Sequence, residues 1–91
     1  MEVQNGTSIV GAAGATAESL KAAGFNVTKT GNAEQPVYEE TLVIYKGAEG
    51  PSRAKAVINT LGVGRAVDGE VYYKFDDDIL VIVGSDYKPF V

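Results

Sequence analysis

The sequence predicts an α+β domain built as a two-layer sandwich, with the element order βαββαβ. Two stretches carry apolar residues at helical spacing, and four stretches are apolar or alternate as strands do. Each helix has one apolar face, so both helices are expected to cover the same side of one sheet. The sheet is predicted to be four-stranded and mostly antiparallel.

Two segments are predicted to be helices. Residues 11–23 are mostly alanine with apolar positions at helical spacing, and Thr7 or Ser8 is placed to cap their start. Gly14 inside this helix costs about 1 kcal/mol relative to alanine, and close packing on the sheet is the favoured explanation for it. The second helix starts at Pro51, which suits a first turn. Its apolar stripe consists of Ala54, Val57, Ile58 and Leu61.

Strands are predicted at residues 2–4, 25–30, 41–45 and 79–83. The run at 41–45 is the clearest, and its apolar content places it in the interior of the sheet. It is expected to pair with 25–30 as a hairpin with a long loop. Residues 66–67 are expected to form only a short extended piece.

Connecting these elements in order gives a ferredoxin-like topology with strand order 4-1-3-2, in which neighbouring strands run antiparallel and crossovers are right-handed. The register of 41–45 depends on which of its side chains face the helices. Leu42 and Ile44 are expected to point toward the helices, whereas Thr41, Val43 and Tyr45 are expected to point away. Residues 71–75 suit either a strand or a loop with buried aromatic side chains.

The bulk composition limits the class of protein. The 91 residues make one domain, 1–91, and a strand-like pattern that begins next to Met1 suggests a domain excised from a longer chain. The formal net charge of −4 opposes phosphate backbones, so nucleic acid is not an expected partner. The sequence has no His and no Cys, which excludes zinc-finger, thiol and disulfide chemistry, and no cofactor is predicted.

Asn5, Gly6 and Thr7 form the first candidate ligand site. Backbone N–H groups between a strand and a helix can hold an anion or a sugar hydroxyl. The segment lacks the spaced glycines of a dinucleotide fingerprint and the lysine of a phosphate-binding loop. A plain turn followed by a helix cap is therefore the favoured interpretation.

Val43 and Tyr45 form the second candidate ligand site. On an open sheet face, an aromatic strip would stack on sugar rings or on a partner protein. The favoured alternative is that Tyr72, Tyr73, the C-terminal tail or a further domain of the parent chain covers this face.

No catalytic or metal-binding residues are predicted. Asp76-Asp77-Asp78 is expected to be a solvated turn, because three adjacent carboxylates cannot all reach one Ca²⁺ ion. The serines have no histidine to activate them as nucleophiles.

A set of short motifs runs nearly from end to end of the chain. They are Val3-Gln4-Asn5-Gly6-Thr7, Gly11 before the alanine-rich helix, Ala22-Ala23-Gly24-Phe25-Asn26-Val27, Gly31-Asn32-Ala33, Tyr38 with Thr41, Ile44-Tyr45 and Gly84-Ser85-Asp86-Tyr87. In this order and spacing they resemble the LytR C-terminal domain of the LytR-CpsA-Psr cell-envelope proteins. Residues 71–78 and the glycine at Gly14 depart from the family pattern.

The resemblance implies an extracytoplasmic domain of Gram-positive-type bacteria that is associated with cell-wall polymer assembly. It also implies a parent chain that is membrane-anchored or secreted. The phosphotransferase chemistry of such proteins belongs to another domain, so the resemblance implies no enzyme activity for this one.

Two functional hypotheses follow. The first is a non-catalytic accessory domain that binds cell-wall glycan or lipid-linked polymer, or that positions a neighbouring catalytic domain. The alternative is a protein–protein interaction module, including a homodimer joined through the edge strand at 25–30. That strand carries only Lys29 as a guard against pairing with another chain.

Overall fold

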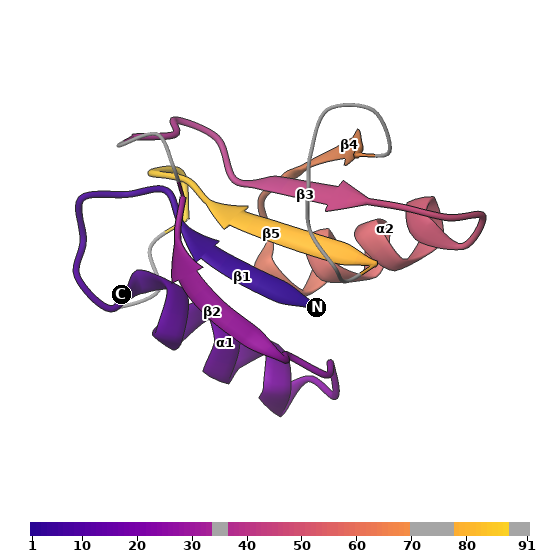
Figure 1. Ribbon diagram of the computed structural model, residues 1–91, viewed down its shortest axis with the longest axis horizontal. Coiled ribbons are helices and arrows are strands. Elements are labelled where there is room, and N and C mark those ends of the chain that lie inside the picture. The colour runs from indigo at the N-terminus through magenta and orange to yellow at the C-terminus, as the bar shows by residue number, and fades with distance from the viewer. Residues whose placement is uncertain (34–36, 70–77, 88–91) are drawn as a thin grey trace.

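The computed structural model describes residues 1–33, 37–69 and 78–87, and these form a five-stranded mixed sheet with both helices on one face (Figure 1). The elements in chain order are β1 (Glu2–Asn5), α1 (Ala12–Ala22), β2 (Lys29–Asn32), β3 (Leu42–Tyr45), α2 (Gly50–Leu61), β4 (Arg65–Asp68) and β5 (Ile79–Val83). The order across the sheet is β2-β1-β5-β3-β4.

Two strand–helix–strand units and one inserted strand make up the sheet. In the first unit α1 connects β1 to its parallel neighbour β2, and in the second α2 connects β3 to its parallel neighbour β4. β5 lies between the units, parallel to β1 and antiparallel to β3. The α+β class and the shared helix face are therefore confirmed, whereas the ferredoxin-like antiparallel order and the hairpin of β2 with β3 are wrong.

The error in topology originates at β4. Arg65–Asp68 is short and polar, and the sequence favoured only a short extended piece there. In the structure this segment pairs with the whole of β3, which makes α2 the crossover between two parallel neighbours. With β4 on one side of β3, β5 occupies the other side.

The main core lies between the sheet and the two helices. Its centre is formed by side chains without exposed surface, namely Val3, Val43, Val81, Leu20 and Val57. Val43 thus points toward the helices, and partly buried Tyr45 packs on the same side, so the predicted register of β3 is reversed. Every residue of β3 is apolar, so no alternation fixes its phase, and a shift by one residue turns every side chain over.

The opposite face of the sheet is closed as well. Leu42, Ile44, Leu80 and Ile82 form a second buried cluster, with exposed fractions between 0% and 7%. Partly buried Tyr38 packs against this cluster. The open face that was expected to receive a ligand is therefore absent.

The first helix and the second strand begin later than predicted. The N-cap of α1 is Gly11, with φ 83° and no side-chain cap, so capping by Thr7 or Ser8 is wrong. β2 begins at Lys29 and lies at an edge of the sheet, as expected for this segment. Phe25 precedes β2 and packs, partly buried, against the helix-side core.

Gly6 and Gly14 have opposite surroundings, the first crowded and the second open. Gly6 does not have a positive φ, but a Cβ there would lie 2.6 Å from Tyr38 Cδ1 and 2.7 Å from Val83 O, so close approach excludes a side chain. Gly14 is exposed, and a Cβ there would meet nothing within 4 Å. Packing against the sheet therefore does not explain Gly14.

A strand-end clip, formed by Thr41, Gly84 and Asp86, fastens the start of β3 to the segment after β5. Thr41 has no exposed surface, and it donates its N–H to Asp86 Oδ1 at 2.9 Å and its hydroxyl to the same oxygen at 2.7 Å. The hydroxyl of Thr41 also accepts the N–H of Gly84 at 2.9 Å. The clip satisfies the polar side chain of Thr41 in a position that water does not reach.

Gly14→Ala is expected to raise the free energy of unfolding by about 1 kcal/mol, because alanine favours the helix and meets no obstacle here. Gly6→Ala is expected to lower it by about 1–3 kcal/mol, because the added methyl group is overpacked. Urea unfolding monitored by circular dichroism measures both changes. A destabilised Gly14→Ala variant would contradict this account of α1.

Asp86→Ala is expected to lower the free energy of unfolding by about 1–3 kcal/mol, because the buried Thr41 hydroxyl and N–H lose their acceptor. Asp86→Asn keeps an acceptor oxygen and should lose less. Glu18→Ala, an exposed change on α1, serves as the neutral control. If Asp86→Ala and Glu18→Ala unfold at the same urea concentration, the clip contributes nothing to stability.

Candidate functional site

The polar turn at Asn5, Gly6 and Thr7 is closed by its own hydrogen bonds. Asn5 Oδ1 accepts two hydrogen bonds from Thr7, one from its N–H at 2.9 Å and one from its hydroxyl at 2.6 Å. Asn5 Nδ2 donates to Ile9 O at 2.8 Å. Thr7 Oγ1 accepts the N–H of Ile9 at 3.1 Å, and Gly6 donates its N–H to Val83 O at 2.9 Å. These N–H groups are used within the protein, so they do not form the anion cradle considered from the sequence.

The polar turn is joined to two distant segments of the chain. Tyr38 donates its N–H to Gly6 O at 2.7 Å, and Ser85 donates its N–H to Tyr38 O at 2.8 Å. β1, β2 and β5 run parallel, so their carboxyl ends meet at this same edge of the sheet. The turn, Tyr38 and the strand-end clip therefore gather at one end of the domain.

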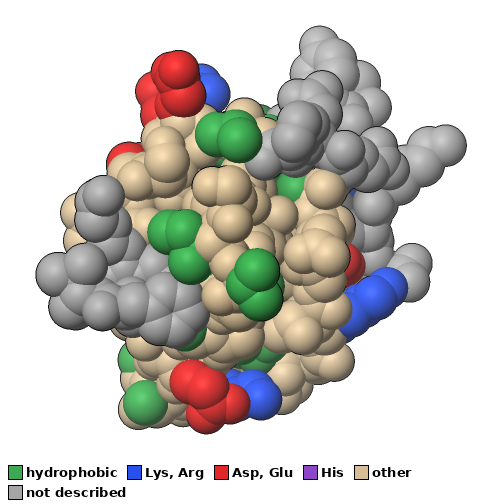
Figure 2. Space-filling view, turned by 90° about the vertical axis from the view of Figure 1, so that its left-hand side faces the viewer, with side chains coloured by type: hydrophobic (Ala, Val, Ile, Leu, Met, Phe, Trp, Pro, Cys, Tyr) green, Lys and Arg blue, Asp and Glu red, His purple; other side chains and the backbone are tan. Residues whose placement is uncertain are grey.

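Three aliphatic side chains project from the same end. In the part of the chain that the structure describes, the exposed large hydrophobic residues are Ile9 (41%), Val10 (93%) and Val37 (58%). Ile9 and Val10 belong to the loop between β1 and α1, and Val37 precedes Tyr38, which bonds that loop at Gly6. We call these three residues the apolar tip. Figure 2 looks onto this end of the molecule and shows hydrophobic side chains at the surface among polar atoms.

The second predicted site, Val43 and Tyr45, does not form an exposed strip. Val43 has an exposed fraction of 0%, so no ligand reaches its side chain in the folded domain. Tyr45 is partly buried, and its ring lies against Gly50 at the start of α2. The structure brings Asn5, Gly6 and Thr7 together at the tip end and places Val43 in the core.

A groove of about 380 Å³ opens at the other end of the domain, between the segment after α1 and the start of α2. Its apolar lining includes Phe25, Val57 and Ile79. This groove lies at the amino ends of β1 and β5, away from the apolar tip.

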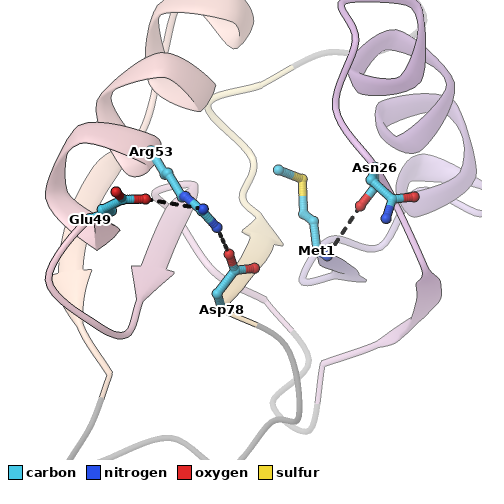
Figure 3. Close-up of polar contacts among 5 residues, drawn as sticks. All are labelled: Met1, Asn26, Glu49, Arg53 and Asp78. Carbon is cyan, nitrogen blue, oxygen red and sulfur yellow. Dashed lines mark hydrogen bonds and ion pairs between the residues drawn. The ribbon is translucent and has the colours of Figure 1, made fainter.

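Polar contacts frame this groove (Figure 3). Arg53 of α2 forms ion pairs with Glu49 and with Asp78, and the amino group of Met1 donates to Asn26 O at 3.2 Å. Because two carboxylates already pair with Arg53, this side chain does not offer an unpaired positive charge to an anionic ligand.

The described ranges 1–33, 37–69 and 78–87 contain neither a metal-binding group of side chains nor a membrane-spanning helix. No group of three or more His, Cys, Asp or Glu side chains there is placed to hold a metal ion. No helix there has the length and apolar character needed to cross a bilayer. Asp76 and Asp77 of the predicted acidic turn, and the aromatic run at 71–75, lie outside the described residues.

Sequence reasoning missed the apolar tip and the purpose of the strand-end clip. Ile9-Val10 stands between a polar turn and a helix, and Val37 stands in a loop, so none of them belongs to a helical or strand pattern. Aliphatic residues in a loop, outside any helical or strand pattern, were the available signal for an exposed apolar surface. Thr41 was expected at the start of a strand and Asp86 in a C-terminal motif, and nothing local shows that they meet.

Comparison with known proteins gives three findings. The family model described as LytR cell envelope-related transcriptional attenuator matches residues 1–87. The protein named "Vesiculogenesis and immune response regulator" of Mycobacterium tuberculosis is 46% identical over 63 residues, which is 68% of this chain and 38% of that protein. The solution structure of the C-terminal domain of RV0431 has a TM-score of 0.59 at 35% identity, and the match covers 92% of this chain and 70% of that one.

The family model spans nearly the whole chain, including both the polar turn and the strand-end clip. The resemblance seen in the sequence motifs is thereby confirmed. The chain belongs to the family described as LytR cell envelope-related transcriptional attenuator, and it is a LytR C-terminal domain.

Proposed function

We propose that this domain is a non-catalytic accessory domain of a bacterial cell-envelope protein, and that it holds a protein surface against its apolar tip. A neighbouring catalytic domain of the same chain is the partner that fits an accessory role best. The observation that carries the proposal is the gathering of Ile9, Val10 and Val37 at one end of the domain. Exposed apolar residues that are concentrated at one end of a domain favour a contact site there, because such residues are otherwise scattered singly over the surface.

Hydrogen bonds hold the loops of the apolar tip in place, which suits a domain that positions a neighbouring domain. Asn5 ties the loop that carries Ile9 and Val10, and the bond from Tyr38 to Gly6 ties the loop that carries Val37. Contacts that are already ordered cost less conformational entropy when a partner binds.

Binding of cell-wall polymer is the other accessory role expected from the sequence, and it has less support. Sugar rings stack on exposed aromatic side chains, whose flat faces are apolar. Tyr45 packs against the core, and Tyr38 packs against the second cluster. The apolar tip offers branched aliphatic side chains, which match the apolar surface of a protein better than the hydroxyl-rich surface of a glycan.

We infer that the domain works outside the cytoplasmic membrane, as part of a chain that is membrane-anchored or secreted. The family description refers to the cell envelope, which supports this location. The chain has no cysteine, so its fold does not depend on the redox state of the compartment.

A photo-crosslinking amino acid at Val10, placed in the full-length protein in its own bacterium, tests the proposal. The expected product is a discrete band of protein mass, or an internal crosslink to another domain, that resists cell-wall hydrolases. The same amino acid at Ser52, exposed at the start of α2, is the control. A hydrolase-sensitive smear would favour polymer binding instead, and equal yields at Val10 and Ser52 would remove the tip as a contact surface.

With the photo-crosslinking amino acid moved to Ile9, Val10→Asp is expected to abolish the crosslinked product while changing the free energy of unfolding by less than about 0.5 kcal/mol. The side chain of Val10 is 93% exposed, so a charge there disturbs a contact and not the core. Thermal unfolding and crosslink yield are measured on the same preparations. Full crosslinking by the Val10→Asp variant would mean that apolar contact at the tip is not what holds the partner.

A further inference from the structure

β2 is an edge strand whose margin is uncovered. It is the last strand on its side of the sheet, and all residues of Lys29–Asn32 are exposed. Thr30 is in register with Val3, whose side chain packs toward the helices, yet Thr30 itself stays exposed. α1 therefore leaves this margin of the helix-side face open.

The backbone groups of β2 alternate between the sheet and solvent. Ala33 donates its N–H to Asn5 O at 3.0 Å, so Ala33 is directed toward β1. Successive strand residues direct their backbone groups to opposite sides, so Gly31 also faces β1. Thr30 and Asn32 then direct their N–H and C=O groups outward, which is the arrangement that accepts an additional strand.

We propose that β2 pairs antiparallel with β2 of a second copy of this domain, with Gly31 opposite Gly31 of the partner subunit. In this register Thr30 exchanges hydrogen bonds with Asn32 of the partner subunit, and Asn32 does so with Thr30 of the partner subunit. A Cβ at Gly31 would meet nothing within 4 Å, so open space surrounds the centre of the pair. The sheet then continues from one copy into the other.

The position of Lys29 favours the antiparallel orientation of the second copy over the parallel one. Lys29 is the charged residue of β2, and in the antiparallel register it lies opposite Ala33 of the partner subunit. In a parallel, in-register pair the lysines would lie side by side, and like charges in that position repel. Opposing the small Ala33 also leaves room for the long lysine side chain to reach solvent.

The edge at β4 is better guarded than the edge at β2. β4 carries Arg65 and Asp68, and charged side chains on an edge discourage pairing. Arg65 is also bonded to Glu40 at 2.9 Å. Pairing through β2 goes beyond the proposed function and does not use the apolar tip.

Sedimentation equilibrium of the domain from micromolar to millimolar concentration tests this pairing. The average mass is expected to rise from 9.5 kDa toward twice that value. Thr30→Pro removes the outward N–H, and proline is tolerated on an edge strand where that N–H faces solvent. This variant is expected to weaken self-association by at least about tenfold and to keep the circular dichroism spectrum of the wild type.

Thr30→Val is the matched control, since it changes the side chain and keeps the N–H, and it should still associate. Val10→Asp should associate like the wild type, which separates this proposal from contact through the apolar tip. Concentration-dependent amide shifts confined to residues 29–33 would locate the interface. A wild type that stays at 9.5 kDa throughout, or a folded Thr30→Pro variant that associates fully, would overturn the pairing.

Discussion

The arrangement of this domain depends on the insertion of β5 between β1 and β3. All five residues of Ile79–Val83 are buried: helices cover one face of the strand, and on the other face Leu80 and Ile82 belong to a second buried cluster against which Tyr38 packs. β1 with β2, and β3 with β4, would each be only a two-stranded sheet without it. Sheets of two strands are marginal in water, so β5 both joins the units and makes each of them stable.

The opposite directions of the two pairings made by β5 also create the candidate contact end. Because β5 is parallel to β1, their carboxyl ends coincide and Gly6 reaches Val83. Because β5 is antiparallel to β3, the start of β3 comes to the same edge and Thr41 reaches Asp86. The loops that carry the apolar tip are thus fixed by strand directions, and their positions do not rely on the loop sequences alone.

The sequence predicted elements and side-chain directions well where buried residues recur at a regular spacing, and poorly where they do not. Both helices and the fully apolar β5 could be identified, since spacing and runs of apolar residues reflect burial directly. β3 is apolar at every position, so its phase was open and the side-chain directions of Val43 and Tyr45 were reversed. Polar β4 carried too weak a signal, and its omission changed the strand order. The polar turn was recognisable from Asn5 and Gly6, but the meeting of Thr41 with Asp86 is a long-range event that no local pattern encodes.

The position of β5 has a consequence for how the chain matures. Glu2 pairs with Leu80, so the first strand of this domain waits during synthesis for the last strand that the structure describes. Until β5 emerges, the facing edges of β1 and β3 stand open to other nascent chains. Closing the sheet then requires contacts between the two ends of the domain, which makes it the slow, entropically costly step of folding. Synthesis that stalls before residue 79 therefore leaves two separate two-stranded sheets, because β5, the strand that joins them, is absent.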